Sequence, residues 1–186
     1  MTRAVFRRYF QELGWKRTLG GTTLSMEFPD RIITLIPQIW RTSLGPAEVK
    51  IDLNPGLSTR RFSAYCTTIL QPKDRTFYSF FRPGPPMRMF VDEISMNIAF
   101  DASAKVLSWA KPLNLATCLR TNLSYPKEAA PLFTVYRMIA LKLEGRDAEL
   151  DEIITDLRTW SRQGYDPNIT EAHVQRAIDL DVSAGL

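Results

Sequence analysis

Residues 14–40, GWKRTLGGTTLSMEFPDRIITLIPQIW, contain two strand patterns on either side of a turn. Apolar and polar residues alternate over 23–28, which is typical of a strand with one buried face. Residues 31–36 are more continuously apolar, as expected for a strand nearer the middle of a sheet. Pro29 and Asp30, between the two patterns, favour a turn. This stretch therefore predicts a β-hairpin that begins an antiparallel sheet.

The neighbouring segments extend this sheet and place a helix in front of it. Residues 3–13 have apolar side chains at helical spacing, and Gly14 follows them as a natural helix end. Residues 48–53 alternate between apolar and charged side chains and predict a third strand of an antiparallel meander. Residues 60–70, RRFSAYCTTIL, are rich in β-branched and aromatic side chains, so we expect a fourth strand there.

The segment that follows the expected meander gives mixed signals. Residues 93–101 again alternate between apolar and small or polar side chains and predict a strand. We then expect Asp101 or Ser103 to cap a helix over residues 104–110. The pattern of residues 113–123 fits a strand and a helix equally well.

The C-terminal third has the pattern of consecutive helices. Two apolar stripes at helical spacing end at Gly145 and Gly164, and a shorter third helix is expected over 167–182 with Thr170 as its N-cap. The stripes consist of Leu132, Tyr136, Ile139 and Leu143, and of Leu150, Ile153, Ile154, Leu157 and Trp160.

These patterns together predict an α+β fold. We expect an antiparallel sheet that is packed by helices on one face and is followed by a C-terminal helical segment. The expected sheet domain spans residues 1–125, and the helical segment, 126–186, is expected to pack on the same domain. A chain of 186 residues with 45% apolar residues is sufficient for one packed core.

The charges are unevenly distributed along the chain, which carries a net charge of +4. Residues 1–90 contain 14 Lys/Arg and 6 Asp/Glu, whereas residues 91–186 contain 10 and 14. A basic half favours an anionic partner, such as nucleic acid, an anionic membrane or an acidic protein. The acidic half argues against simple non-specific binding of nucleic acid, because it would repel the same phosphates.

The sequence favours a cytoplasmic protein. No apolar run approaches the roughly 20 residues that a membrane span needs, and the N-terminus lacks the apolar core of a secretory signal. Cys66 and Cys118 both lie in apolar stretches and do not form a disulfide framework. We therefore expect two buried thiols in a reducing compartment.

The sequence lacks the signatures of cofactor and metal sites. It contains neither GxGxxG nor GxxxxGK[ST], and one His with two distant Cys cannot form a closed tetrahedral metal site. A Ser-His-Asp triad would need His173, which lies in a predicted surface helix. We expect no catalytic residues and no cofactor or metal, and an enzyme whose site assembles from scattered residues is the third alternative.

Two segments are candidate surfaces for binding a protein partner. The first is the proline-rich loop over 71–90, which mixes aromatic and basic side chains. Its candidate anchors are Phe77, Tyr78, Phe81, Arg82 and Arg88. The same mixture also suits stacking on single-stranded bases, or a stiff connection whose aromatic side chains cap the core.

The second candidate surface is an acidic helix. Its candidate residues are Glu149, Asp151, Glu152 and Asp156. Such a face can meet the basic cleft of a toxin or a nuclease and accelerate the encounter. A solvated helix face, with carboxylates near the helix N-terminus favoured by the macrodipole, explains the same residues without a partner.

In its layout the chain resembles small cytoplasmic bacterial proteins of the immunity or interaction type. The resemblance rests on an N-terminal helix ending in ELGWKR, an antiparallel sheet through about residue 70 and a helical C-terminus. It implies a non-catalytic protein-binding module, such as an immunity or effector-escort protein that binds a toxin or effector. The alternative is a nucleic-acid-binding protein that would use Arg7, Arg8, Arg60, Arg61, Arg82 and Arg88.

Overall fold

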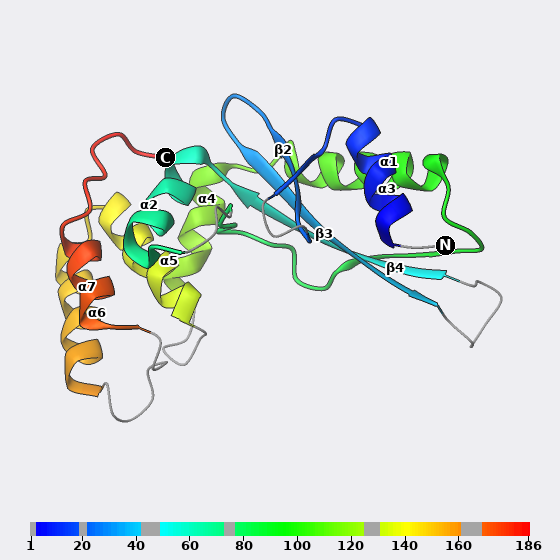
Figure 1. Cartoon of the computed structure of the whole chain (residues 1–186). Coiled ribbons are helices and arrows are strands. Elements are labelled where there is room, and N and C mark those ends of the chain that lie inside the picture. Colours follow the sequence, from blue (N-terminus) through cyan, green and yellow to red (C-terminus); the bar gives the residue numbers. More distant parts are fainter. Residues whose placement is uncertain (1–2, 19–21, 42–48, 73–76, 125–130, 161–168) are drawn as a thin grey trace. The chain divides into compact units, whose positions relative to one another are not determined.

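A computed structural model gives the fold of the chain as two compact units (Figure 1). The sheet unit consists of residues 1–58 and 74–113, and the helical unit of residues 59–73 and 114–186. The boundary expected from the sequence, after residue 125, falls inside the helical unit. The structure describes residues 3–18, 22–41, 49–72, 77–124, 131–160 and 169–186.

The sheet unit contains five antiparallel strands in the order β1-β2-β3-β4-β5. The strands expected over 23–28, 31–36 and 48–53 are confirmed as β2, β3 and β4, and the antiparallel α+β fold is as predicted. The strand bounds are Lys16–Arg17 for β1, Leu24–Glu27 for β2, Ile32–Arg41 for β3, Val49–Ser58 for β4 and Met87–Val91 for β5.

Strand β3 is longer than the sequence pattern indicated, because it continues through Pro37 to Arg41. The pairing of β2 with β3 ends where Leu24 lies opposite Leu35, whereas the pairing of β3 with β4 continues to Arg41. Beyond Leu35 the β2 side of β3 is therefore an edge among the described strands. A proline is tolerated in such a position, since no ladder hydrogen bond on that side is lost.

Two helices, α1 (Arg3–Glu12) and α3 (Met96–Ala110), lie side by side on one face of the sheet (Figure 1). The helix expected over residues 3–13 is confirmed as α1, and Gly14 follows it with a φ of +89°. The largest buried side chains of this layer are aromatic. Phe6 and Phe10 pack edge to face at 5.1 Å between ring centroids, and Trp15 packs against Phe10 at 5.7 Å.

The prediction of a strand over residues 93–101 is wrong, because α3 begins at Met96. The N-cap is Ser95, not Asp101 or Ser103, and both of those residues lie inside the helix. Alternation over a few residues was misleading because the buried positions further along follow a helical spacing. Those buried positions are Ala99, Ala102, Val106 and Ala110.

A buried hydrogen bond joins α3 to the segment after α1. The indole Nε1 of Trp15 donates to Ser103 Oγ at 2.8 Å, so the hydroxyl that was expected to cap a helix is used inside the core instead. A buried indole N–H needs such a partner, because an unsatisfied donor in the core costs free energy.

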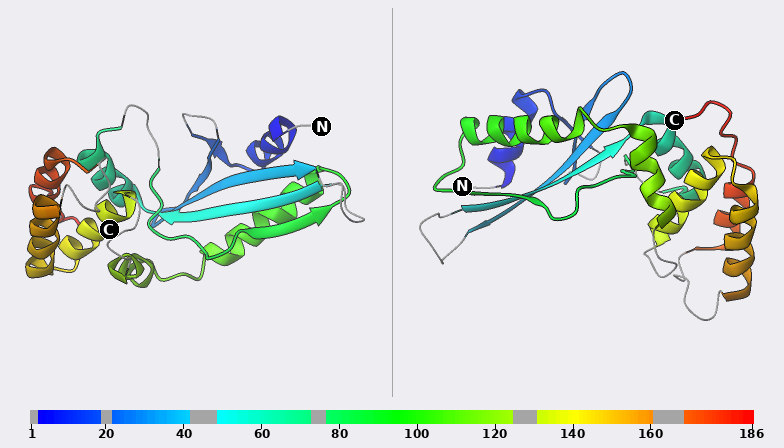
Figure 2. Two further views of the ribbon diagram at one scale, coloured as in Figure 1. Left: turned by 90° about the horizontal axis from the view of Figure 1, so that it is seen from below. Right: turned by 180° about the vertical axis from the view of Figure 1, so that it is seen from behind.

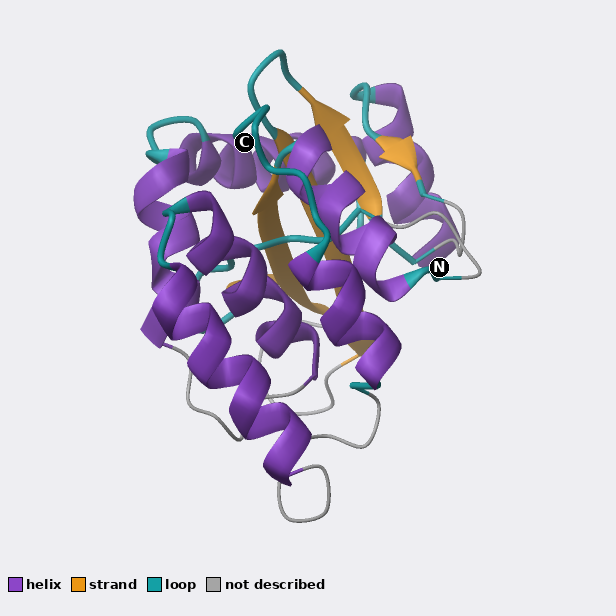
Figure 3. Ribbon diagram, turned by 90° about the vertical axis from the view of Figure 1, so that its left-hand side faces the viewer, coloured by secondary structure: helices purple, strands orange, loops and turns teal. Residues whose placement is uncertain are grey.

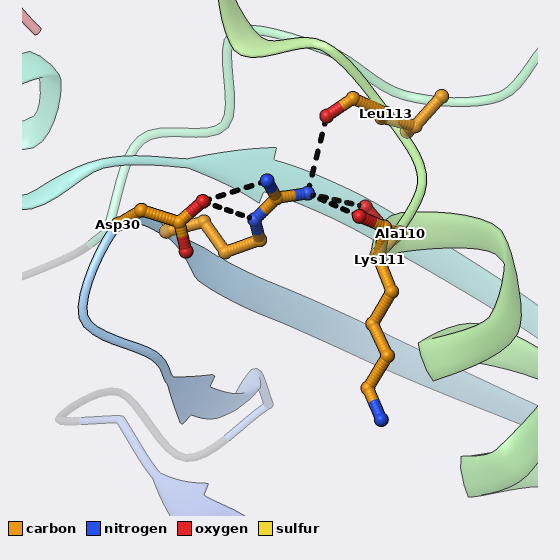
Figure 4. Close-up of polar contacts among 5 residues, drawn as sticks. Asp30, Ala110, Lys111 and Leu113 are labelled. Carbon is orange, nitrogen blue, oxygen red and sulfur yellow. Dashed lines mark hydrogen bonds and ion pairs between the residues drawn. The ribbon is translucent and has the colours of Figure 1, made fainter.

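The C-terminal end of α3 is fixed to the β2–β3 turn by Arg31 (Figure 4). Its Nη1 donates to the carbonyls of Ala110, Lys111 and Leu113 at 2.7, 3.0 and 3.2 Å. These carbonyls lie at the helix end, where the helix itself leaves acceptors unused. Asp30 accepts hydrogen bonds from Nε and Nη2 of the same guanidinium, and this hydrogen bonding lowers the pKa of Asp30.

Each described range of the helical unit contains at least one helix, and none of these ranges contains a strand (Figure 3). The three helices expected in the C-terminal third are confirmed as α5, α6 and α7, with Gly145 after α5 and Thr170 as the N-cap of α7. Gly164 lies outside the described residues. The bounds are Arg60–Leu70 for α2, Leu115–Arg120 for α4, Thr121–Ser124 for the 3₁₀ helix η1, Pro131–Leu143 for α5, Asp147–Trp160 for α6 and Glu171–Ile178 for α7.

The prediction of a fourth strand over residues 60–70 is also wrong, since these residues form α2. Its N-cap is Thr59, whose side chain accepts a hydrogen bond from the backbone N–H of Phe62 at 3.0 Å. Phe62 packs edge to face on Tyr136 of α5 at 5.1 Å between ring centroids. Packing of an apolar helix face thus overrides the β-propensity of individual residues in this segment.

Candidate binding surface

Residues 77–90 of the proline-rich loop lie in the sheet unit, and some of them pack within its fold. Phe77, Tyr78 and Phe81 are half-buried, whereas Arg82 is exposed. The Phe81 ring stacks on Trp109 of α3, with centroids 6.1 Å apart and ring planes inclined by 7°. Phe81 also forms an isolated antiparallel bridge with Leu57 of β4.

Residues just before Phe81 pack over the end of the sheet. Ser79 Oγ lies 2.7 Å from Thr34 Oγ1, and both side chains are buried. Gly56, which lies opposite Thr34, makes this approach possible. A Cβ on Gly56 would lie 2.6 Å from Ser79 Cβ and 2.6 Å from Thr34 Oγ1. The loop therefore contributes to the core as well as to the surface.

The structure does not bring the predicted loop anchors together on one surface. Phe81 is bridged to Leu57 and faces α3, whereas Arg88 lies on β5 opposite Asp52. Leu57 and Asp52 are five positions apart on β4, and this odd offset makes their side chains point to opposite faces of the sheet. Arg88 therefore lies on the face away from α1 and α3, opposite to Phe81.

The predicted acidic residues lie on α6 in the helical unit. Asp151 and Glu152 are exposed, while Glu149 forms an ion pair with Arg146 and Asp156 is half-buried. The helical unit has 11 Lys/Arg and 11 Asp/Glu, whereas the sheet unit has 13 and 9. The net positive charge of the chain thus belongs to the sheet unit, and α6 is an acidic helix whose charge is balanced by basic residues elsewhere in the helical unit.

The sheet unit carries a further exposed surface on its strands, which was not predicted from the sequence. Strand register places Trp40, Lys50 and Phe90 in one row across β3, β4 and β5. The next row consists of Gln38, Asp52 and Arg88. We call these six side chains the aromatic-basic face.

The aromatic-basic face points away from α1 and α3, because its side chains alternate along each strand with the helix-facing ones. Seen from below in Figure 2, left, α3 lies behind β4 and β5. Trp40 and Phe90 are 45% and 60% exposed. Among the described residues, the third exposed large apolar side chain, Phe100, lies on α3 and is also 60% exposed.

A buried carboxylate organises the basic side chains of this face. Asp52 Oδ2 lies 2.9 Å from Lys50 Nζ, and Asp52 Oδ1 lies 2.8 Å from Arg88 Nε. Burial alone would raise the pKa of Asp52, but the hydrogen bonds from Arg88 and Lys50 outweigh it, so the pKa is lowered. The Asp52 side chain is 8% exposed and the Arg88 side chain 49%, so the anion lies beneath the cation.

This face was not predicted from the sequence, because the expected second strand covered only residues 31–36. Residues 38–41, QIWR, continue the strand and bring Trp40 opposite Lys50. Ile39 and Trp40, which follow Gln38 after the proline, were the available signal, since both residue types favour strands. Phe90 could not be assigned to the same row, because its register depends on a pairing across the inserted helix α2.

A groove lies on the helix side of the sheet unit, with a volume of about 370 Å³. It is lined by Leu13, Met26, Phe100, Leu107 and Lys111, together with small α3 residues. Within the described ranges, no cluster of three or more His, Cys, Asp or Glu side chains could hold a metal ion. Burial raises the pKa of the Cys66 thiol well above its ordinary value, which disfavours the reactive thiolate.

The fold and this surface define the class of protein: an α+β protein of two units, whose sheet unit carries exposed aromatic and basic side chains. Residues 2–182 match the model of a family described as "Family of unknown function (DUF6990)", and the chain belongs to this family. A search of curated proteins finds no match to the chain, and neither does a search of solved structures. Across the described helices, none combines the length and the apolar character needed to cross a membrane.

Proposed function

We propose that this protein is a non-catalytic protein-binding module that docks its partner on the aromatic-basic face. The observation that carries the proposal is the exposure of Trp40 and Phe90 on either side of Lys50. Aromatic and arginine side chains dominate the energetics of protein interfaces, where they are buried by the partner. Arg88, which the sequence analysis selected as an anchor, belongs to the same face.

Within this class, we propose the specific role of a bacterial immunity or effector-escort protein that acts in the cytoplasm. It is supported by the layout of an N-terminal helix, an antiparallel sheet and a helical C-terminal part. The exposed acidic residues Asp151 and Glu152 on α6 are compatible with this role as a second contact, which would mainly increase the association rate.

Binding of single-stranded nucleic acid is the second candidate function. Two aromatic side chains in one row of a sheet, with a lysine between them, can stack bases and contact the phosphate that joins them. The excess of basic residues in the sheet unit favours the same ligand. This candidate shares the aromatic-basic face with the first, so the ligand bound there distinguishes the two.

The proposal is tested with three alanine variants of the affinity-tagged full chain. Trp40→Ala and Phe90→Ala truncate the aromatic-basic face, and Phe100→Ala is the matched control because Phe100 is as exposed as Phe90 but lies on α3. After cross-linking in the source cells and purification of the partner, we expect each face variant to weaken binding by about 2 kcal/mol, or roughly 30-fold. Equal binding by all four chains would refute the proposal.

The second candidate is tested with fluorescein-labelled 12-nucleotide RNA and DNA strands at physiological salt. Sub-micromolar binding that is lost in Trp40→Ala and retained in Phe100→Ala would establish nucleic acid as the ligand of this face. We expect no binding in this range.

A further inference from the structure

The charged groups that the aromatic-basic face exposes are cations, although the face also contains a carboxylate. Both oxygens of Asp52 are used by Lys50 and Arg88, and the Asp52 side chain is almost fully buried. The side chains of Lys50 and Arg88 remain 26% and 49% exposed. A partner therefore meets two cations that are held in place from below by an anion it cannot reach.

Arg3, the first residue of α1, adds positive charge beside Trp40. The Arg3 guanidinium lies 5.8 Å from the centroid of the Trp40 ring, which is within the range of a cation–π contact. Exposed aromatic surface that is surrounded by cations is complementary to a partner that combines apolar and anionic groups.

Arg88 is oriented to receive one such anionic group. Its Nε donates to Asp52, and the described residues provide no bond for its terminal nitrogens. A guanidinium fixed at one nitrogen presents the remaining N–H groups as a planar fork, and a carboxylate binds such a fork with two parallel hydrogen bonds. Because the side chain is already ordered, less conformational entropy is lost when the partner binds.

The surroundings of Phe90 favour discrete carboxylates over a phosphate backbone. Asp92 and Glu93 directly follow β5 and are both exposed. A strand of nucleic acid that continued past Phe90 would bring its regularly spaced phosphates close to these two carboxylates, and like charges repel. An acidic protein segment can place its carboxylates over Lys50 and Arg88 alone.

A second copy of the same face is not a suitable occupant. Two aromatic-basic faces that met each other would bring the cations Lys50, Arg88 and Arg3 of both copies together. Like-charge juxtaposition across an interface costs several kcal/mol, which opposes self-association through this face.

We infer that the partner inserts an acidic segment across β3, β4 and β5, with carboxylates bound by Arg88 and Lys50 and apolar side chains packed on Trp40 and Phe90. The inference rests on the proposed function and specifies the chemistry of the partner. It also assigns a role to Asp52, which holds the two cations in position without contacting the partner.

The experiment uses the photoreactive residue p-benzoylphenylalanine in the full chain, placed at position 90 or at position 100. Phe90 and Phe100 are equally exposed, so their labelling by chance should be similar. We expect a protein adduct at position 90 that is absent at position 100. The cross-linked peptide of the partner should contain more Asp and Glu than Lys and Arg.

The purified partner is then titrated with charge variants of the chain. Lys50→Met and Arg88→Met remove one charge each from the face, and Lys111→Met is the control because Lys111 follows α3 and lines the groove on the helix side of the sheet unit. We expect each face variant to raise the Kd about five-fold or more and to reduce its dependence on salt, with no change in the control. Thermal melting of each variant verifies that it is folded.

The outcomes separate the two proposals. A protein adduct at position 90 whose peptide is neutral or basic, or a Kd that Lys50→Met and Arg88→Met leave unchanged, would overturn the acidic partner but leave protein binding intact. The absence of a protein adduct at position 90 would overturn both, and a nuclease-sensitive adduct would replace both with the nucleic-acid candidate.

Discussion

At the scale of single residues, Arg31 joins two elements that are far apart in sequence. One guanidinium nitrogen satisfies three carbonyls at the end of α3, and the Arg31 side chain is only 14% exposed. Hydrogen bonds from a charged donor in a partly buried position contribute more than surface ion pairs do. Arg31 therefore fixes where α3 ends relative to the β2–β3 turn.

Replacement of Arg31 should destabilise the sheet unit. We expect Arg31→Met to lower the free energy of unfolding by about 2–3 kcal/mol, because the helix-end carbonyls lose their charged donor. Arg31→Lys should restore a part of this, since a compact ammonium cannot reproduce the fork that also binds Asp30. Urea denaturation measures both, with the exposed Arg82→Met as the control. Equal stability of Arg31→Met and Arg82→Met would contradict the assigned role.

Asp52 should make the stability of the protein depend on pH in the acidic range. Its pKa is lowered in the folded state, so its contribution is fully present above the unfolded pKa of about 3.9. The contribution is lost as the pH falls through the lower, folded pKa. Asp52→Asn should cost about 1–3 kcal/mol at pH 7 and less below pH 3. Urea denaturation of both proteins from pH 7 to pH 2.5 tests this, and a constant difference would contradict it.

The candidate site was only partly predictable at this scale. Arg88 was selected from its aromatic and basic neighbours in sequence, and it does lie on the exposed face. Trp40 was not predicted, because the expected strand covered only residues 31–36 and β3 continues to Arg41. The row of Trp40, Lys50 and Phe90 depends on strand register, which local sequence does not encode when strands are separated by an insertion.

At the scale of elements, the segments that were predicted correctly are those in which local sequence and tertiary packing favour the same structure. The hairpin of β2 and β3 has a turn pair between two strand patterns, so local chemistry and tertiary structure agree. Residues 60–70 have the composition of a strand but become α2, because Thr59 caps them and an apolar face at helical spacing packs on α5. Amino-acid composition alone does not show that these residues pack on α5.

The N-cap of α2 is therefore a sensitive position. Thr59→Ala removes the acceptor of the Phe62 N–H and should cost about 1–2 kcal/mol of stability. Thr59→Ser should keep most of the stability, because the hydroxyl is retained. Thr67→Ala on the same helix is the control, since Thr67 is exposed and alanine has the higher helix propensity. If Thr59→Ala and Thr67→Ala unfold at the same urea concentration, the cap is not significant.

At the scale of the whole molecule, the two units are interleaved in sequence. The chain leaves the sheet unit after Ser58, returns at Asp74 and leaves again after Leu113. Composition and local patterns gave the correct fold class, but they indicated a single boundary near residue 125. The division into two units depends on contacts between segments that are distant in sequence, such as Phe62 with Tyr136. Local sequence patterns do not predict such contacts.

Two deletion variants distinguish these divisions. In the first, residues 1–58 and 74–113 are joined by a Gly/Ser linker in place of 59–73, which keeps the sheet unit complete. The second, residues 1–125, keeps α2 but removes α5, so Phe62 loses its packing partner. We expect the first variant to unfold cooperatively and to bind little anilinonaphthalene sulfonate, and the second to bind the dye strongly because α2 exposes apolar surface. The reverse result would favour the single boundary.

The insertion of α2 between β4 and β5 also has a consequence for the order in which the protein is made. After Ser58 completes β4, a further 28 residues (59–86) must be synthesised before β5 begins at Met87. At about 5–20 residues per second, this takes about 1–6 s, during which the outer edge of β4 has no strand to pair with. A nascent chain at this stage needs protection from aggregation. Ribosomes stalled before β5 emerges should therefore recruit more chaperone than ribosomes stalled after β5 has emerged. Equal recruitment in the two states would show that the unpaired edge of β4 does not promote aggregation.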